Sequence, residues 1–237
     1  MTLETHCPVC ATAFKDAAAF CAGCGKRRGD VETEGVAFAI RFYLALLAVQ
    51  ILTMVLVRTG TAAFTAISFA TGALALVTFV VAGVHHKLVL PAYRRVGFGP
   101  IGYGLILIAS PVVILVITGY VHALAHAFGI HHDELEGFRD HGVPAIVGLV
   151  ALAPPIFEEL AFRGLVYGAL AKSLRRSEAY LISSFAFAML HLSIPSLLTH
   201  LPLGLYLCWL RERSGSMYPS MFAHFCHNLG VVIAELY

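Results

Sequence analysis

The sequence predicts an all-α polytopic membrane protein with about seven transmembrane helices. Of its 237 residues, 59% are hydrophobic and 13% are charged, whereas a soluble domain carries roughly 25% charged residues. The apolar residues are gathered in several long runs, and about 20 helical residues cross a hydrocarbon core of about 30 Å. The net charge of only +2 gives no reason to expect a nucleic-acid partner, so the expected surroundings are a lipid bilayer.

The transmembrane helical domain is expected to occupy residues 36–237. Its apolar segments run roughly over 36–57, 61–84, 100–125, 143–170, 179–192, 197–210 and 217–236. The fifth and sixth segments are short for a full crossing. We therefore expect them to be tilted, partly buried in the bundle, or extended by residues that flank them.

Residues 1–28 contain paired cysteines and predict a separate small unit, a zinc-ribbon, followed by a linker over 29–35. Cys7 and Cys10 form one C-x2-C pair, and Cys21 with Cys24 forms the second. Four thiolates at this spacing can close tetrahedrally on Zn²⁺, which would stabilise a segment too short to build its own core. Two disulfides, or four unrelated cysteines, are the alternatives. Reduced thiols would place the N-terminus in the cytosol.

The distribution of basic residues predicts the same orientation. With the N-terminus inside and the seven segments alternating, thirteen Lys and Arg residues fall on inside segments, while only Arg58 and Arg139 fall outside. Positive charge accumulates on the cytoplasmic side of membrane proteins. We therefore predict an integral protein of a bacterial inner membrane, with a cytosolic N-terminus and a C-terminus outside.

The fourth segment contains ionisable residues in an apolar run, IFEELAFRG. Such residues inside a membrane are candidates for function. Glu159 and Arg163 are spaced i,i+4 and are expected to pair along one face of the helix, whereas Glu158 points about 100° away. Pro154 and Pro155 just upstream should interrupt the helix and free backbone carbonyls, which are tolerated at that depth only against protein or a wet cavity. A structural salt bridge is the alternative interpretation.

Two further segments carry polar residues at a similar predicted depth. His191 lies on the fifth segment, while His224 and Asn228 lie i,i+4 on the seventh, with His227 bordering the same face. Counted from the inside end at about 1.5 Å per residue, these positions and the glutamates reach roughly 11–18 Å. We therefore expect one shared site, near the middle of the bilayer or in its cytosolic half.

Glutamate, histidines and an amide can together activate water and stabilise an oxyanion, as peptide hydrolysis requires. The same groups could also ligate a divalent metal through His191, His224 and a glutamate. The chain contains no G-x-S-x-G and no H-E-x-x-H motif. The residues alone leave the two alternatives open.

Three motifs in order resemble a known family: FEELAFRG, FAFAMLH over 185–191 and HFCHN over 224–228. They are similar to the E-E-x-x-x-R, F-x-x-x-H and H-x-x-x-N motifs of the CPBP family of intramembrane proteases. This family includes the type II CAAX prenyl endopeptidases and the bacterial Abi proteins. The resemblance covers a protease core at about residues 140–237, and LPLG over 201–204 is a weak counterpart of a further family motif.

The resemblance implies a site made of Glu158, Glu159, Arg163, His191, His224 and Asn228. In this family pattern Glu158 and His191 would activate a water molecule, His224 and Asn228 would support the oxyanion, and Glu159 with Arg163 would hold the site. The family is often described as metalloproteases, although water activated by a glutamate requires no metal.

The function expected from these inferences is an intramembrane endopeptidase. Its substrates would be membrane-associated or lipidated peptides or proteins, a prenylated C-terminus among them. Two alternatives remain: a non-catalytic membrane scaffold that recruits a protein partner through the zinc-ribbon, and a proton-coupled transporter. No internal repeat favours the transporter.

Overall fold

The computed structural model describes residues 6–7, 12–14, 21–24, 33–93, 97–128 and 138–236. Apart from an isolated bridge between His6 and Ala13, the regular structure of these residues is helical, which confirms the all-α prediction. The helices are α1 (Thr33–Arg58), α2 (Ala63–Val84), α3 (His86–Tyr93), α4 (Pro100–Phe128), η1 (Arg139–His141), α5 (Val143–Ile146), η2 (Val147–Leu152), α6 (Ala153–Glu159), η3 (Leu160–Val166), α7 (Tyr167–Ser173), α8 (Arg176–Met189), α9 (Ile194–Ser214) and α10 (Tyr218–Leu236).

All seven predicted apolar segments are helical. Within the described residues, four stretches are long and apolar enough to cross a membrane: Glu34–Arg58, Ala63–Val84, Pro100–Ile117 and Val143–Ser173. The remaining three segments form α8, which has only 14 residues, and α9 and α10, which carry more polar side chains. The chain is thus a polytopic membrane protein. The short helix α3 was not predicted from the sequence.

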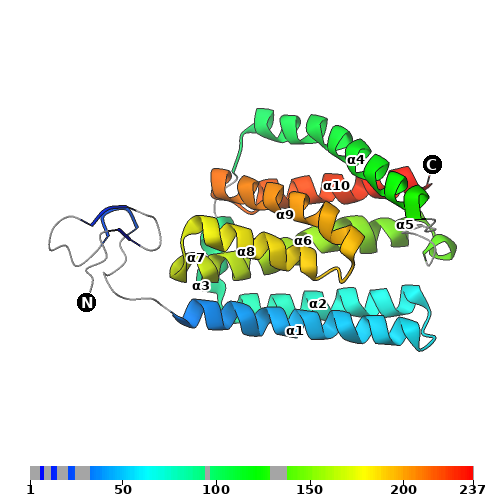
Figure 1. Cartoon of the computed structure of the whole chain (residues 1–237), viewed down its shortest axis with the longest axis horizontal. Helices are drawn as coiled ribbons and strands as arrows, with labels where there is room; N and C mark the ends of the chain where they lie inside the picture. Colours follow the sequence, from blue (N-terminus) through cyan, green and yellow to red (C-terminus); the bar gives the residue numbers. More distant parts are fainter. Residues whose placement is uncertain are drawn as a thin grey trace.

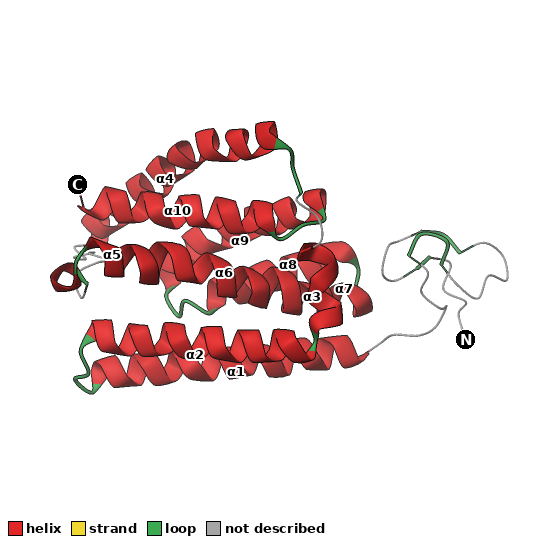
Figure 2. Ribbon diagram, turned by 180° about the vertical axis from the view of Figure 1, so that it is seen from behind, coloured by secondary structure: helices red, strands yellow, loops and turns green. Residues whose placement is uncertain are grey.

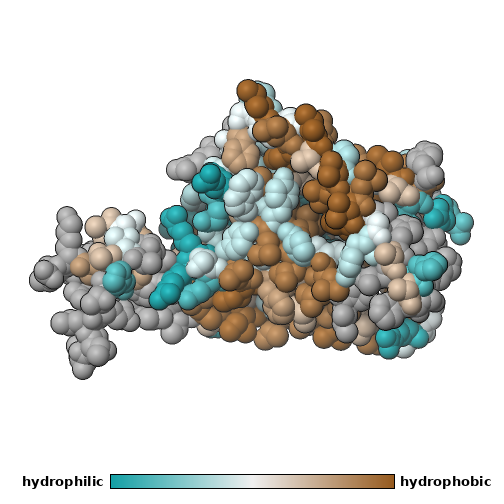
Figure 3. All heavy atoms as spheres, turned by 45° about the horizontal axis from the view of Figure 1, so that its top comes forward, coloured by the Kyte–Doolittle hydropathy of each residue, from teal (hydrophilic) through white to brown (hydrophobic). Residues whose placement is uncertain are grey.

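The long helices lie roughly side by side, and successive segments run in opposite directions (Figure 1). The pair α1–α2 forms one edge of the bundle and α4 the other, with α6, α8, α9 and α10 between them, as the reverse view also shows (Figure 2). The C-terminus lies at the end of the bundle opposite the start of α1 (Figure 1). On the face drawn in Figure 3, the most hydrophilic residues lie toward the two ends, and between them large hydrophobic areas are crossed by residues of intermediate hydropathy.

The fourth segment is one continuous helical run in which the register changes. Two π-helical stretches, η2 and η3, flank the α-helical turn α6 that carries both glutamates. The backbone N–H of Ala153 bonds to the carbonyl of Gly148, and that of Tyr167 bonds to Phe162, both five residues back. Such π-helical stretches are found often at functional sites. All seven residues of η3 are buried, so this segment forms the centre of the core.

The hairpin of α8 and α9 turns back inside the bundle. α8 begins where the side chain of Glu178 accepts a hydrogen bond from the backbone N–H of Arg175, at 3.0 Å. It ends at Met189, and Leu192 then takes a left-handed conformation with φ of 52°. The turn lies nearer the middle of the bundle than the connection between α1 and α2 (Figure 1). His191 therefore lies in a turn beyond the end of α8, and not inside a helix as the predicted segment 179–192 implied.

Candidate active site

A completely buried ion pair occupies the centre of the site. Arg163 donates from one terminal nitrogen to Glu159 Oε1 at 2.9 Å, and both side chains are 0% exposed. The other terminal nitrogen of Arg163 donates to the carbonyl oxygen of Gly204 in α9, at 3.0 Å. The predicted i,i+4 pairing is confirmed. Because a buried charge is costly without a partner, this pair fixes the position of the turn that carries the glutamates.

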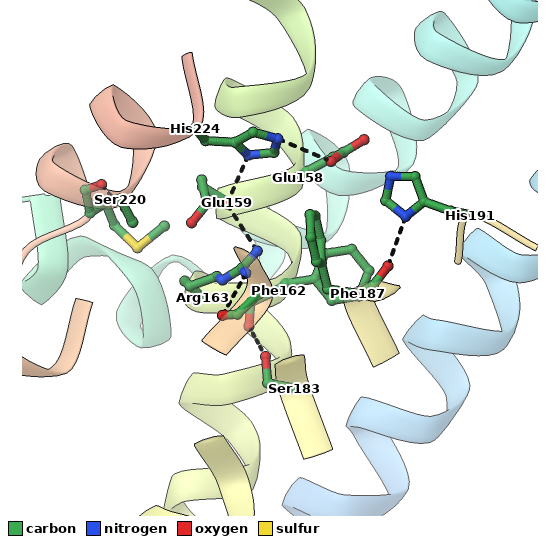
Figure 4. Close-up of polar contacts among 11 residues, drawn as sticks. Glu158, Glu159, Phe162, Arg163, Ser183, Phe187, His191, Ser220 and His224 are labelled. Atoms are coloured by element: carbon green, nitrogen blue, oxygen red, sulfur yellow. Dashed lines mark hydrogen bonds and ion pairs between the residues drawn. The ribbon is translucent and has the colours of Figure 1, made fainter. Parts of the chain in front are cut away.

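His224 of α10 connects the two glutamates (Figure 4). Its Nδ1 lies 3.0 Å from Glu159 Oε1, and its Nε2 lies 3.9 Å from Glu158 Oε2. The side chain of Glu158 is 14% exposed, whereas that of Glu159 is 0% exposed. A carboxylate accepting at Nδ1 holds one tautomer of the imidazole, so that Nε2 is left facing Glu158.

The ring of Phe187 in α8 lies in contact with three polar residues of the site. It lies 4.4 Å from the guanidinium carbon of Arg163, close enough for a cation–π contact. It also meets His191 and His224 edge to face, with ring centroids 5.2 Å and 5.7 Å apart. Phe187 is fully buried. Its ring therefore holds the two histidines and the ion pair in fixed relative positions.

His191 is oriented by its own helix end and by a second histidine. Its Nδ1 lies 3.1 Å from the carbonyl oxygen of Phe187, a residue in the last turn of α8 (Figure 4). Its ring packs against that of His200 in α9, with centroids 3.7 Å apart. If Nδ1 donates to this carbonyl, Nε2 of His191 is free for a reactant.

A cavity of about 330 Å³ adjoins these side chains. The predicted residues that line it are Glu158, His191, His224 and Asn228, while Glu159 and Arg163 lie behind them. The structure thus brings together polar residues from three parts of the chain that the sequence separates. The other walls come from α1, α2, α4, Phe138, η2, α6, α9 and α10. The lining residues there are Gln50, Thr53, Ile67, Ala70, Thr71, Leu74, Ile117, Phe138, Leu149, Val150, Pro154, Phe157, Thr199, His200, His227 and Val231.

The cavity extends from the glutamates toward the end of the bundle where the C-terminus lies. Gln50 and Thr53 are in the second half of α1, and Ile67 and Thr71 are in the first half of α2. These halves adjoin the α1–α2 connection, at the same end as the C-terminus (Figure 1). The expected location near the middle of the bundle agrees with this.

Asn228 is held by a backbone carbonyl that the sequence leaves without a donor. Its amide nitrogen donates to the carbonyl oxygen of Val150 in η2, at 2.9 Å. The residues four and five positions after Val150 are Pro154 and Pro155, which have no N–H to offer in either α-helical or π-helical register. The expectation that the prolines free a carbonyl is therefore confirmed, and Asn228 satisfies it.

Three residues of the site were not predicted from the sequence or were given too little weight there. His200 lines the cavity, and the criterion of an ionisable residue in an apolar segment should have identified it. His227 is 8% exposed and also lines the cavity. Gly204, the last residue of the weak LPLG counterpart, supplies the carbonyl that Arg163 binds; backbone acceptors have no signal in sequence.

At the N-terminus, three cysteines form a group that could hold a metal ion. The sulfur atoms of Cys7, Cys21 and Cys24 all lie within 4.8 Å of one another. Cys7 Sγ and Cys24 Sγ are 3.4 Å apart, and thiolates around a tetrahedral zinc are about 3.8 Å apart. Cys10, the fourth predicted ligand, lies outside the described residues.

Fold and site together define an integral membrane protein whose ionisable residues surround a cavity inside a helical bundle. Residues 140–230 match the family model "Type II CAAX prenyl endopeptidase Rce1-like". A stretch of 122 residues is 29% identical to "Putative membrane peptidase YdiL" of Bacillus subtilis (strain 168) and covers 51% of this chain. The chain spans about half the length of this curated relative, 50%. No solved structure matches the chain. The resemblance inferred from the three motifs is confirmed.

Proposed function

We propose that the protein is an intramembrane endopeptidase in which water activated by glutamate and histidine cleaves a peptide bond. The observation that carries this proposal is the convergence of Glu158, His191 and His224 on one cavity. Beside them, the fully buried pair of Glu159 and Arg163 holds the structure in place. The match of residues 140–230 to a peptidase family supports the same assignment.

The proposed reaction begins with a water molecule between Glu158 and His191. The carboxylate of Glu158 accepts a proton from the water, and the oxygen attacks the carbonyl carbon of the scissile bond. The C–N bond then breaks, and Glu158 returns the proton to the departing amine. The products are a carboxylate and an amine, so one water molecule is consumed and Glu158 is regenerated.

The negative oxygen of the tetrahedral intermediate needs donors already in position. His224 is the first candidate: as an imidazolium it donates from Nδ1 to Glu159 and has a second N–H at Nε2, on the cavity side at Glu158. Asn228 is the second, since an amide has two N–H groups and Val150 accepts only one. Glu159 and Arg163 act as positioning residues for His224.

The proposed substrates are membrane-associated or lipidated peptides or proteins, with prenylated C-termini among them. Support comes from the position of the cavity within the bundle and from the family match. We further propose a bacterial inner membrane location with the N-terminus in the cytosol and the C-terminus outside. The distribution of basic residues supports this orientation.

The test is cleavage of a fluorogenic membrane peptide by the purified full chain in proteoliposomes. Glu158→Gln and His191→Ala should each abolish cleavage while the melting temperature is retained. Glu178→Gln, at an exposed glutamate of α8, is the matched control and should cleave normally. Normal cleavage by both site variants would refute the proposal and favour a scaffold, and proton-coupled flux without cleavage would favour a transporter.

We also propose that Cys7, Cys10, Cys21 and Cys24 bind structural zinc and that the zinc-ribbon recruits a protein partner. The mutual closeness of the sulfur atoms of Cys7, Cys21 and Cys24 supports metal binding. Metal analysis of the full chain should give one zinc per chain, lost in Cys7→Ser. Chelation of the Cys7→Ser variant then tests the active site by itself, because loss of cleavage there would reveal a second, catalytic metal.

A further inference from the structure

We propose that the protein binds an anionic phospholipid at the end of the bundle where α1 begins. The phosphate would lie in a pocket between α1, α3 and α7, and an acyl chain would lie in the groove between α1 and α2. This site is separate from the cavity at Glu158 and does not depend on the proposed peptidase function.

The pocket lies where headgroups are expected, whichever way the protein is oriented. Three of the four candidate membrane spans have an end here, at Glu34, Val84 and Ser173. Glu34 and Val84 line the pocket directly, and Lys172 next to Ser173 lines it too. Since the ends of spans mark the boundary of the hydrocarbon, the pocket lies at the level of lipid phosphates.

The pocket and the adjoining groove carry an excess of basic side chains. Lys87 of α3 and Lys172 of α7 line the pocket, and Arg41 of α1 lines the groove. All three are exposed. Among the residues that the structure describes, none of them forms an ion pair with a carboxylate. Glu34 is the single acidic lining residue, so the site favours an anion.

The pocket continues into an apolar groove. The pocket has a volume of about 570 Å³ and the groove about 590 Å³, and they share Glu34, Phe38, Val84 and His85. The remaining wall of the groove is almost wholly apolar and runs along the lipid-facing side of α1 and α2; it comprises Phe42, Ala45, Val77, Val80 and Val81. A charged head joined to an apolar tail therefore fits the combined site better than free phosphate does.

Close packing builds the walls of the pocket. A Cβ atom on Gly35 would lie 2.5 Å from the carbonyl oxygen of Ala169, so only glycine lets α1 approach α7 this closely. The ring of His85 packs against that of Phe38 with centroids 4.4 Å apart, at the junction of pocket and groove. The shape of the pocket is thus set by the close approach of α1 to α7 and by the packing of the His85 ring against Phe38.

The headgroup contacts are tested by native mass spectrometry of the full chain in detergent, titrated with phosphatidylglycerol and with phosphatidylcholine. The wild-type chain should retain phosphatidylglycerol in preference to phosphatidylcholine. Lys87→Gln/Lys172→Gln should weaken phosphatidylglycerol binding about 30-fold, as expected for two basic residues near a lipid phosphate. Arg58→Gln, at the far end of α1, is the control and should change binding less than about twofold.

The groove is tested by a substitution that fills it. Ala45→Phe should reduce retention of phosphatidylglycerol, because the new ring occupies the space of the acyl chain. Ala109→Phe, at an exposed position of α4, adds the same ring elsewhere on the lipid-facing surface and should not. Both variants are first checked for an unchanged melting temperature, and Ala45→Leu replaces Ala45→Phe if that variant is unstable.

Several results would overturn the proposal. Equal retention of the two lipids by the wild-type chain would show that no anion site exists. Displacement of bound lipid by millimolar inorganic phosphate, with no effect of Ala45→Phe, would identify a phosphate site in place of a lipid site. Equal losses in the Lys87→Gln/Lys172→Gln and Arg58→Gln variants would reduce the effect to general surface charge.

Discussion

The two adjacent glutamates allow one chemical change to be made in two environments. Glu158→Gln and Glu159→Gln each replace a carboxylate by an amide of nearly the same shape. Glu158 lines the cavity, and its Oε2 lies 3.9 Å from Nε2 of His224. Glu159 is fully buried and accepts from both Arg163 and His224. We predict that Glu158→Gln loses activity and keeps stability, whereas Glu159→Gln loses stability.

The magnitudes follow from burial. In Glu159→Gln the guanidinium of Arg163 stays buried and loses its charged partner, while the carbonyl of Gly204 and the ring of Phe187 still contact it. Removing one member of a buried pair costs about 3–5 kcal/mol, and the amide oxygen retains part of the bonding, so we expect about 3 kcal/mol. That corresponds to a melting temperature lowered by roughly 6–12 °C. Glu158→Gln breaks no short contact in the structure, so less than about 1 kcal/mol is expected.

The assay is thermal unfolding of both variants and of Glu178→Gln in the same detergent, followed by peptide cleavage below the lowest melting temperature. A double variant, Glu159→Gln/Arg163→Met, provides a further check. Removing both charges should restore part of the lost stability, because no unpaired charge remains buried. Equal destabilisation by Glu158→Gln and Glu159→Gln, or no recovery in the double variant, would refute this division of roles.

Three other predictions concern the surroundings of the site and the N-terminal cysteines. Gly204→Ala should lower stability by about 1–3 kcal/mol, because the added Cβ would lie 3.0 Å from a backbone oxygen of α8, whereas Gly72→Ala, with nothing within 4 Å, should have no such cost. Asn228→Ala should lower kcat about 100-fold and destabilise by about 1–3 kcal/mol, since the carbonyl of Val150 loses its donor; an unchanged kcat would exclude the oxyanion role. Cys7→Ser should abolish zinc binding by metal analysis yet leave cleavage of a small membrane peptide unchanged.

The sequence predicted the helices well, because apolar runs bounded by polar residues have few alternatives inside a bilayer. The predicted segment 61–84 agrees with α2 (Ala63–Val84) within two residues at its start. The short helix α3 was missed, since its eight residues include Pro91 and fall between two strong apolar signals. The direction in which the cavity extends has no signal in the sequence, because hydropathy does not reveal the depth at which the α8–α9 turn ends.

The sequence predicted which polar side chains form the site, but not the packing contacts that hold them in place. The pairing of Glu159 with Arg163 follows from their spacing, and the convergence of His191, His224 and the glutamates follows from matched depths. Phe187 appeared in the sequence only as part of a motif, although its ring contacts Arg163, His191 and His224. Its role depends on how α8 packs, and that is a property of tertiary structure.

The proline pair explains why a polar cavity is stable at this place. Pro154 and Pro155 deny the carbonyl of Val150 a backbone donor in either register, and in a membrane no bulk water replaces it. Asn228, one helical turn after His224, supplies the missing hydrogen bond. Satisfying that carbonyl therefore draws α10 against η2 and, with it, brings His224 to the glutamates at 3.0 Å and 3.9 Å. The missing backbone hydrogen bond in the fourth segment thus specifies the position of α10. Pro154 of that segment and Asn228 of α10 both line the cavity, which therefore lies between these two parts of the chain.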